Sequence, residues 1–363
     1  MLDTGLSPAE LEVPPELPSG QLKLAFIAEA PGADEVDKRK PFVGGVGGVF
    51  NAVLRSAGVF RNECLTFHFY PRALKNGMVT EEHAHLGKDG FIAFHTECAR
   101  RMWRILAEHK PTIVVPLCNS ALKALTGQPL TIAGTRGSTL QGRCPEGIGL
   151  PPFKVCPTFG PGFIIANWKQ YHVVIGDLIR ALRQLEQGRI VTYPERRLTI
   201  APTIEQVREY LGPKGPARNC PLLSCDIETG WGMIRGLSFA HKEEEGFYVP
   251  FLSLAPNCPS RSYWPTVGQE IEAWQLVKET LESPVPKLGQ NFAGYDAMWL
   301  LKKMGIRVRN LRHDLRLLHA ALYPELPKSL KFMAGAYSAQ GAWKSWAKHS
   351  QLSQANRGDK RDE

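Results

Sequence analysis

The chain has 363 residues, a length that leads us to expect two domains. Hydrophobic residues make up 43% and charged residues 22% of the sequence, which excludes a fibrous or wholly disordered protein. The formal net charge of +9 permits a polyanionic partner without requiring one, and no apolar run approaches the roughly 20 residues that span a bilayer.

The first half of the chain alternates strand patterns with helix patterns. The predicted strands cover 24–28, 112–116 and 153–156, and the predicted helices cover 49–57, 93–108, 121–125 and 170–186. The polar segment around His83 and His85 is expected to be a loop. Alternating strands and helices predict an α/β sandwich with a largely parallel sheet.

The chain changes character between 188 and 221, where Pro, Gly and charged residues are typical of loops. Thr203 and Gln206 form a capping-box pattern that opens a short helix to about 211. A second α/β unit is predicted from strands at 222–228, 234–240, 246–250 and 287–289 and from helices at 270–281, 297–304 and 315–322. We therefore predict an N-terminal tail (1–20), a first domain (21–189), a second domain (190–343) and a polar tail (344–363).

Two carboxylates end the first strand of the second domain. Asp226 and Glu228 are two residues apart and share one face of a strand, while Cys225 and Ile227 face the core. Adjacent anions repel each other unless a cation lies between them, and two divalent metals would also activate a water for phosphodiester hydrolysis. A solvated strand end is the alternative interpretation.

A second acidic position follows the strand at 287–289. Asn291 lies just after that strand, and Asp296 opens a helix whose apolar residues recur at helical spacing. Asp296 is therefore expected at the helix N-terminus, near the sheet edge, as a helix cap, as a metal ligand or as both.

Together these motifs resemble the DEDD (DnaQ-like) 3′–5′ exonuclease superfamily over residues 220–337. The segment from His313 to Phe332 further resembles the region that follows the second motif in phage polymerases of the DNA polymerase I type. The resemblance implies a ribonuclease H-like fold and metal-dependent removal of nucleotides from DNA 3′ ends. It assigns Asp226, Glu228 and Asp296 as catalytic metal ligands for Mg²⁺ or Mn²⁺, and Asn291 as a substrate-binding residue.

The third motif of that superfamily, a Tyr or His four or five residues before a fourth metal-binding Asp, is absent. Asp359 follows Ala355 and Asp362 follows Gly358 at the corresponding spacing. We therefore expect an incomplete two-metal site, and we interpret the chain as the front part of a longer or split family A polymerase. A separate polymerase polypeptide would then be a partner.

The first domain carries a strand, a tight turn and a Gly-rich approach to a helix. This pattern runs from Ile27 through Glu29 and Gly32 to Phe42 and Gly44, and it lets backbone amides approach a phosphate or a base. Residues 22–185 resemble the uracil-DNA glycosylase superfamily, in the branch that usually carries an iron–sulfur cluster. The resemblance implies that Glu29 assists the catalytic water and that Phe42 stacks on a flipped uracil.

Further segments extend this resemblance, among them Thr135-Arg-Gly-Ser138 and Pro157-Thr-Phe-Gly-Pro161. The substrate-binding residues expected in the first domain are Gly32, Phe42, Gly44, Arg136 and Ser138.

Two polar groups that read uracil in that superfamily are missing. Phe67 occupies the position of the Asn, and Gly160 occupies the position of the His. Only Cys98 matches a cluster ligand, so no iron–sulfur cluster is expected. The first domain is therefore predicted to be a degenerate glycosylase that binds DNA.

The sequence thus predicts a DNA replication or repair protein with two α/β domains, a uracil-DNA glycosylase-like α/β/α sandwich and a ribonuclease H-like exonuclease domain. Its expected partner is DNA, either single-stranded or at 3′ ends, and no membrane association is expected. Eight scattered cysteines favour the cytoplasm, that of the host cell if the protein is phage-encoded. The alternatives are an active uracil-DNA glycosylase and a non-catalytic DNA-binding or replisome subunit.

Overall fold

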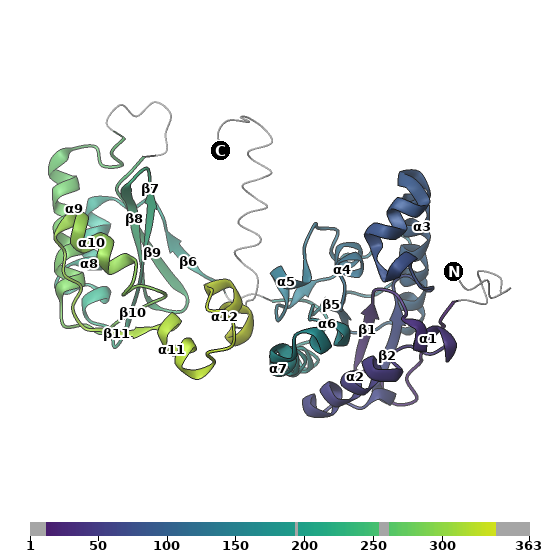
Figure 1. Ribbon diagram of the computed structural model, residues 1–363. Coiled ribbons are helices and arrows are strands. Elements are labelled where there is room, and N and C mark those ends of the chain that lie inside the picture. The colour runs from purple at the N-terminus through teal and green to yellow at the C-terminus, as the bar shows by residue number, and fades with distance from the viewer. Residues whose placement is uncertain (1–11, 193–194, 254–260, 339–363) are drawn as a thin grey trace. The chain divides into compact units, whose positions relative to one another are not determined.

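The computed structural model describes residues 12–192, 195–253 and 261–338 (Figure 1). The chain divides into two compact units, one formed by residues up to Thr192 with the segment from Lys331, the other by Tyr193–Leu330. Among the described residues, no helix combines the length and the apolar character needed to cross a membrane. The predicted polar tail (344–363) lies outside the described residues.

The first unit is built on a five-stranded sheet with the order β2-β1-β3-β5-β4. Its strands are β1 (Leu24–Ala28), β2 (Cys64–His68), β3 (Ile113–Pro116), β4 (Leu140–Gln141) and β5 (Lys154–Val155). All neighbours pair in parallel except β4, which pairs antiparallel with β5 at the edge. The predicted largely parallel sheet is therefore confirmed.

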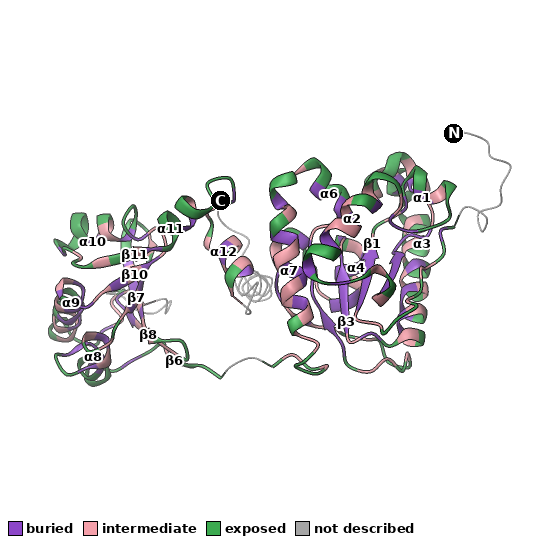
Figure 2. Cartoon of the chain, turned by 90° about the horizontal axis from the view of Figure 1, so that it is seen from below, coloured by how far each residue is buried: buried purple, intermediate pink, exposed green. Residues whose placement is uncertain are grey.

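Helices cover both faces of this sheet because successive strand residues point to opposite sides. Ile27 packs in a core cluster with residues of α3 (Val79–His109) and α4 (Asn119–Thr126). Phe26 packs on the other face, with residues of α2 (Gly44–Ala57), α6 (Pro161–Ala166) and α7 (Tyr171–Arg183). Figure 2 shows the buried strands between helices whose outer sides are exposed. The arrangement is an α/β/α sandwich.

Shorter elements complete the first unit. They are α1 (Ala33–Asp37), η1 (Arg61–Glu63), η2 (Lys75–Gly77), α5 (Ile132–Thr135) and η3 (Trp168–Gln170). The segment around His83 and His85, predicted to be a loop, is helical: it forms the first part of α3, which is interrupted at Gly87 with φ +68°. The buried carboxylate of Glu82 ties the first turn of α3 to the segment before the helix, because it accepts hydrogen bonds from Arg72 Nη2 (2.7 Å) and the Lys75 backbone amide (2.6 Å).

The second unit contains a six-stranded sheet with the order β11-β10-β7-β8-β9-β6. Its strands are β6 (Arg197–Thr199), β7 (Leu223–Gly230), β8 (Met233–Lys242), β9 (Glu245–Pro250), β10 (Lys287–Gly289) and β11 (Leu311–Asp314). Strands β7, β8 and β9 form an antiparallel meander, and β10 and β11 continue the sheet in parallel beyond β7. Strand β6, in a segment expected to be a loop, pairs with β9, and Arg197 forms an ion pair with Glu245.

One core cluster joins this sheet to its helices. They are α8 (Ile204–Leu211), η4 (Pro216–Arg218), α9 (Val267–Glu282), α10 (Asp296–Met304) and α11 (Leu315–Leu322). The capping box that opens α8 is present. The Thr203 hydroxyl accepts from the Gln206 backbone amide at 3.4 Å, and the side-chain Oε1 of Gln206 accepts from the Thr203 backbone amide at 2.9 Å. A last helix, α12 (Leu330–Tyr337), groups with the first unit, although sequence analysis assigned it to the second domain.

Candidate functional sites

Strand β7 presents two carboxylates on one face. Along it, Cys225 and Ile227 are buried, while Asp226 and Glu228 are exposed, as the period of two predicts. Its partner strand β8 shifts register between Glu228 and Thr229. Glu228 therefore adjoins an irregularity near the end of the strand, with Asp226 two residues before it.

Asp296 is brought beside this strand by a bond to its backbone. Strand β10 pairs with β7 only at Leu223 and Ser224, so the Ile227 amide lies beyond the end of β10. The Asp296 carboxylate accepts from that amide at 2.9 Å. Burial and, after it, the negative charges of Asp226 and Asp314 raise the pKa of Asp296 to about 6 from its ordinary value of 3.8, against the bond from Ile227. A buried carboxylate thus lies within electrostatic reach of another at the sheet edge.

The loop that precedes Asp296 is held by Asp314, at the end of β11. Its buried carboxylate accepts from the backbone amides of Asn291 (3.0 Å), Ala293 (3.1 Å) and Arg316 (3.0 Å). Asn291 has φ +61°, a left-handed conformation that Asn adopts more readily than most residues. Sequence analysis did not assign Asp314 a role in the site; the sequence signal was an Asp immediately before an apolar helix, typical of an N-cap.

The Asn291 side chain is held in turn by Arg316. Its carbonyl oxygen accepts from Arg316 Nη1 at 2.7 Å. The exposed guanidinium of Arg316, in the first turn of α11, therefore lies beside Asn291. This places a cationic group next to the predicted substrate-binding residue, a position suited to an anionic ligand.

The donor set fits a hard divalent cation in its chemistry. Within 12–192, 195–253 and 261–338, no group of three or more His, Cys, Asp or Glu side chains is positioned to hold a metal. Mg²⁺ commonly keeps several waters and binds through one or two protein carboxylates plus substrate phosphates. Asp226 and Asp296 supply such a pair; burial is the main cause of the raised pKa of Asp296, and the negative charge of Asp226 raises it further. The residues present fit a sparsely ligated cation.

An aromatic and basic surface adjoins Asp296 along α10. A pocket of about 360 Å³ is lined by Gly294, Tyr295, Met298, Trp299, Lys302 and Lys303. Tyr295 hydroxyl bonds with Thr229 Oγ1 at 2.9 Å, which ties α10 to the end of β7, and Lys303 Nζ lies 5.6 Å from the Trp299 ring centroid. Aromatic faces beside ammonium groups suit stacked bases and phosphates of a single strand.

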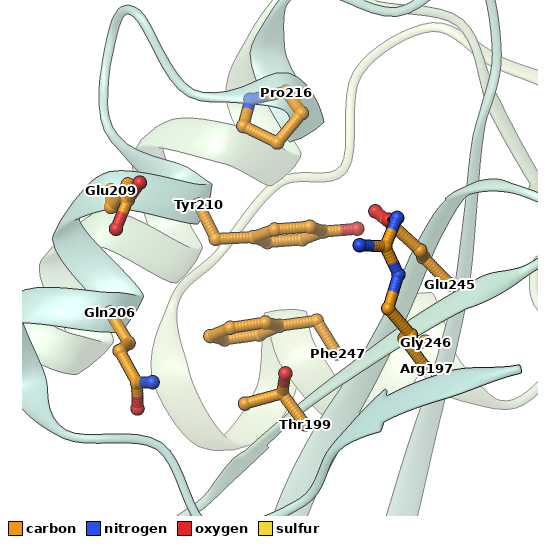
Figure 3. A pocket seen from close by; sticks show the side chains of 9 residues that line it. All are labelled: Arg197, Thr199, Gln206, Glu209, Tyr210, Pro216, Glu245, Gly246 and Phe247. Carbon is orange, nitrogen blue, oxygen red and sulfur yellow. Dashed lines mark hydrogen bonds and ion pairs between the residues drawn. The ribbon is translucent and has the colours of Figure 1, made fainter.

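A second pocket in this unit lies away from the carboxylates. Figure 3 shows Tyr210 and Phe247 stacked, with ring centroids 4.2 Å apart, in a space of about 300 Å³ between α8, β6 and β9. Two of its polar side chains are already engaged: Arg197 pairs with Glu245, and the Tyr210 hydroxyl bonds with His241 Nδ1 at 3.1 Å. In the sheet order, β8 separates β9 from the carboxylate-bearing β7.

In the first unit, Glu29 lies at the carboxyl end of β1 in a chain of polar contacts. Ser120 Oγ donates to Glu29 at 3.4 Å and lies 3.3 Å from the Tyr70 hydroxyl, which lies 2.9 Å from His95 Nδ1. Although Glu29 is exposed, surrounding protein atoms desolvate its carboxylate and raise its pKa. Burial, with the charge of Lys123, lowers the pKa of His95. The carboxylate is therefore well placed to accept a proton from water.

Phe42, predicted to stack on a base, is only 1% exposed. Its ring stacks on Phe50 with centroids 4.0 Å apart, and its amide donates to Glu35 at 2.5 Å. Glu35 also accepts from the amide of Gly32 (2.8 Å) and contacts His68 Nε2 (3.2 Å). The Gly-rich turn is thus closed around a buried glutamate, and the face of Phe42 that meets Phe50 is covered.

Gly44, at the start of α2, has φ +66°. A Cβ there would overlap the Asp34 carboxylate, so the turn requires glycine. The observed role of Gly44 is therefore to let the backbone pass close to α1.

Phe67 and Gly160 are the residues that the sequence resemblance matches to the missing polar readers. Phe67 is fully buried in the core on the α3 and α4 side, and Gly160 is the residue before the first turn of α6. Neither supplies a hydrogen-bonding side chain, so uracil would meet no side-chain donor or acceptor from these two positions.

Arg136 and Ser138 are both buried and already engaged. Arg136 Nε donates to Asp177 at 2.8 Å, and the Ser138 hydroxyl donates to the Thr135 carbonyl. Thr158 donates to the same Asp177 carboxylate at 2.7 Å. The structure thus brings Arg136 into a buried ion network and leaves Ser138 in a local turn.

Comparison with known proteins gives a family match and a set of similar solved structures. Residues 14–183 match the family model of the Uracil DNA glycosylase superfamily. Among solved structures, the chain is similar to the EXD2 exonuclease domain soaked in Mn and GMP, at 19% identity over 44% of this chain and 86% of that chain, with a TM-score of 0.24. The same domain soaked in Mg and dGMP matches at 18% identity over the same shares, with a TM-score of 0.24.

The predicted fold class is confirmed as two α/β units: the first is a sandwich on a largely parallel sheet, whose residues 14–183 match the glycosylase superfamily model, and the second is built on a mixed sheet. The family match supports a DNA-processing protein.

Proposed function

We propose that the second unit is a metal-dependent 3′–5′ exonuclease acting on single-stranded DNA ends and that the first unit is a DNA-binding module without glycosylase activity. The observation that carries the proposal is the bond from the Ile227 amide to Asp296, because it holds a buried carboxylate beside Asp226. Two carboxylates held beside each other at a strand end are the ligands that a divalent cation prefers.

Asp226, Glu228 and Asp296 would hold Mg²⁺ or Mn²⁺, which when bound would activate a water and stabilise the leaving oxygen. Asn291, oriented by Arg316, would bind the terminal nucleotide. Tyr295 and Trp299 would stack on bases, and Lys302 and Lys303 would meet the phosphates. These residues come from the end of β7, from the loop after β10 and from α10, and Arg316 comes from the first turn of α11.

The first unit would contribute affinity rather than base excision. A site built to read uracil needs polar side chains at its edge, and Phe67 and Gly160 provide none. We extend the proposal to a replication setting in the cytoplasm, with a separate polymerase polypeptide as a partner.

A second candidate function is a non-catalytic DNA-binding or replisome subunit. It is favoured by the absence, within the described residues, of any group of three acidic or metal-ligating side chains. The two functions share DNA binding and differ in whether bound DNA is cut.

Polarity of digestion tests the proposal. The full chain is incubated with Mg²⁺ or Mn²⁺ and the same single-stranded oligonucleotide labelled either at the 5′ or at the 3′ end. A 3′–5′ exonuclease shortens the 5′-labelled strand stepwise and releases labelled mononucleotide from the 3′-labelled strand, and a chelator stops both. DNA that is bound but uncut with either metal contradicts the proposal and supports the second candidate.

A further inference from the structure

Two arginines of the first unit converge on the end of helix α12. Arg180 donates from Nη2 to the Gly335 carbonyl at 2.9 Å and from Nη1 to the Ala336 carbonyl at 2.6 Å. Arg136 donates to the same Gly335 carbonyl at 3.2 Å. The last carbonyls of a helix lack partners within it and carry partial negative charge. The backbone carbonyl oxygens at the end of α12 therefore contact the two guanidiniums as the oxygens of an anion would.

One buried carboxylate pairs with both arginines. Asp177 is buried and forms ion pairs with both Arg136 and Arg180. The three side chains together therefore have a net charge of +1. Arg136 is 5% exposed, and Arg180 Nε is buried without a hydrogen-bond partner. A buried excess of positive charge is costly unless oxygens compensate it. The α12 carbonyls do so here.

The contact is closely fitted on both sides. Gly137 has φ +76°, and a Cβ on it would overlap the Gly335 carbonyl oxygen. A Cβ on Gly335 would lie 2.8 Å from the Arg136 carbonyl oxygen, closer than real Cβ contacts. The Arg136 guanidinium lies 5.3 Å from the Phe332 ring centroid. A glycine on each partner therefore allows backbone to meet backbone, which marks a specific docking contact.

We propose that α12 occupies a phosphate-binding site of the first unit, so that its release exposes Arg136 and Arg180 to a phosphate of single-stranded nucleic acid. Two planar guanidiniums that share a net positive charge suit the oxygens of a phosphate, and the helix carbonyls take their place when α12 is docked. The contact is autoinhibitory: nucleic acid and α12 compete for the same donors. The inference concerns the first unit and does not depend on nuclease activity.

Release of α12 by a change on its own side tests this. Gly335→Val introduces a side chain against the Arg136 carbonyl and leaves both arginines intact. Gly162→Val in α6 is the matched control, because a Cβ there meets nothing within 4 Å. Hydrogen exchange across 331–337 reports docking, and binding of a fluorescent single-stranded oligonucleotide in a chelator reports the exposed site without hydrolysis.

The expected result is faster exchange in 331–337 and about 10-fold tighter oligonucleotide binding for Gly335→Val, with Gly162→Val unchanged from wild type. Adding Arg136→Met and Arg180→Met to Gly335→Val should remove the gain. Faster exchange without tighter binding overturns the proposal. Loss of cooperative unfolding of the first unit in Gly335→Val also overturns it, because α12 would then be a structural part of that unit. Hydrogen exchange across 331–337 that is equally fast in the wild type and in Gly335→Val overturns it as well.

Discussion

Asp296 and Ile227, 69 residues apart, are joined by a 2.9 Å hydrogen bond in which the carboxylate accepts from the backbone amide. The bond satisfies an amide that β10 leaves unpaired, but the carboxylate is 3% exposed and lies near two other acidic groups. Its ionised form is therefore unfavourable in the folded protein without a cation, and the pKa of Asp296 is raised to about 6.

Asp296→Asn is expected to stabilise the metal-free protein at neutral pH. The Asn carbonyl can keep the bond from Ile227, while the buried charge is removed. The difference between a pKa of about 6 and the ordinary 3.8 sets an upper bound of about 3 kcal/mol on the gain. Thermal unfolding in a chelator at pH 7.5 measures it, and nuclease activity should fall at least about 100-fold.

The pH dependence has a defined sign. Because the folded pKa of Asp296 is raised, ionisation destabilises the fold progressively as pH rises from about 4 to about 6, and by a constant amount above that. The advantage of Asn should therefore be larger at pH 7.5 than at pH 5 and vanish below about pH 4. Asp89→Asn, at an exposed position on α3, is the control and should change nothing. An Asp296→Asn variant less stable than wild type at pH 7.5 would contradict this account.

Asp314→Ala is expected to lower the free energy of unfolding by about 2 kcal/mol, because three backbone amides lose their acceptor. The loop carrying Asn291 would also lose its left-handed turn, so affinity for Mn²⁺ should fall with it. Chemical denaturation and Mn²⁺ titration check the two effects. Asp314→Asn, which keeps one acceptor oxygen, should lose less; equal stability of Asp314→Ala and wild type would count against the role given to this residue.

The chain should release no free uracil from a uracil-containing single strand, although Glu29 is present with a raised pKa. Glu29 can accept a proton from water, but this does not bind the base. The position that the sequence resemblance assigns to the Asn that binds uracil holds Phe67, a buried apolar residue. Chromatography of the reaction mixture measures the product. Uracil release that Glu29→Gln abolishes would show that the glycosylase alternative is right.

The double change Lys302→Ala and Lys303→Ala should weaken binding of single strands and reduce the slope of log affinity against log salt by about 1 to 2, since each phosphate contact contributes nearly one. Binding is measured in a chelator at several salt concentrations. Lys278→Ala, exposed on α9, removes a similar charge elsewhere and should leave the slope close to that of wild type. An unchanged slope in the double variant would remove α10 from the binding surface.

Much of the fold was predictable from periodicity. The alternation of Asp226 and Glu228 with Cys225 and Ile227 appears in the burial of β7, and the Thr203 capping box opens α8 as predicted. The first turns of α3 were predicted wrongly as a loop, because their stability comes from Glu82 bonding to residues before the helix. Such a tertiary contact leaves no period in the sequence.

Proximity within the site was less predictable than its residue types. Spacing indicated that Asp296 opens a helix, but the bond to Ile227 depends on β10 ending early, which only the sheet register reveals. Arg136 was expected at a substrate and instead meets Asp177 and α12, which were not connected with it by any motif. Long-range pairs of this kind are fixed by topology rather than by local pattern.

Asp226, Glu228 and Asp296, from β7 and α10, are proposed to hold the divalent metal with which the chain hydrolyses DNA 3′ ends. The most direct measurement compares the full chain with the double variant Asp226→Ala, Glu228→Ala on a 5′-labelled single-stranded oligonucleotide with Mg²⁺ or Mn²⁺. The account predicts stepwise shortening from the 3′ end by the wild type and loss of at least about 100-fold in rate in a folded double variant. Equal shortening by both proteins, or none by the folded wild type with either metal, would contradict it.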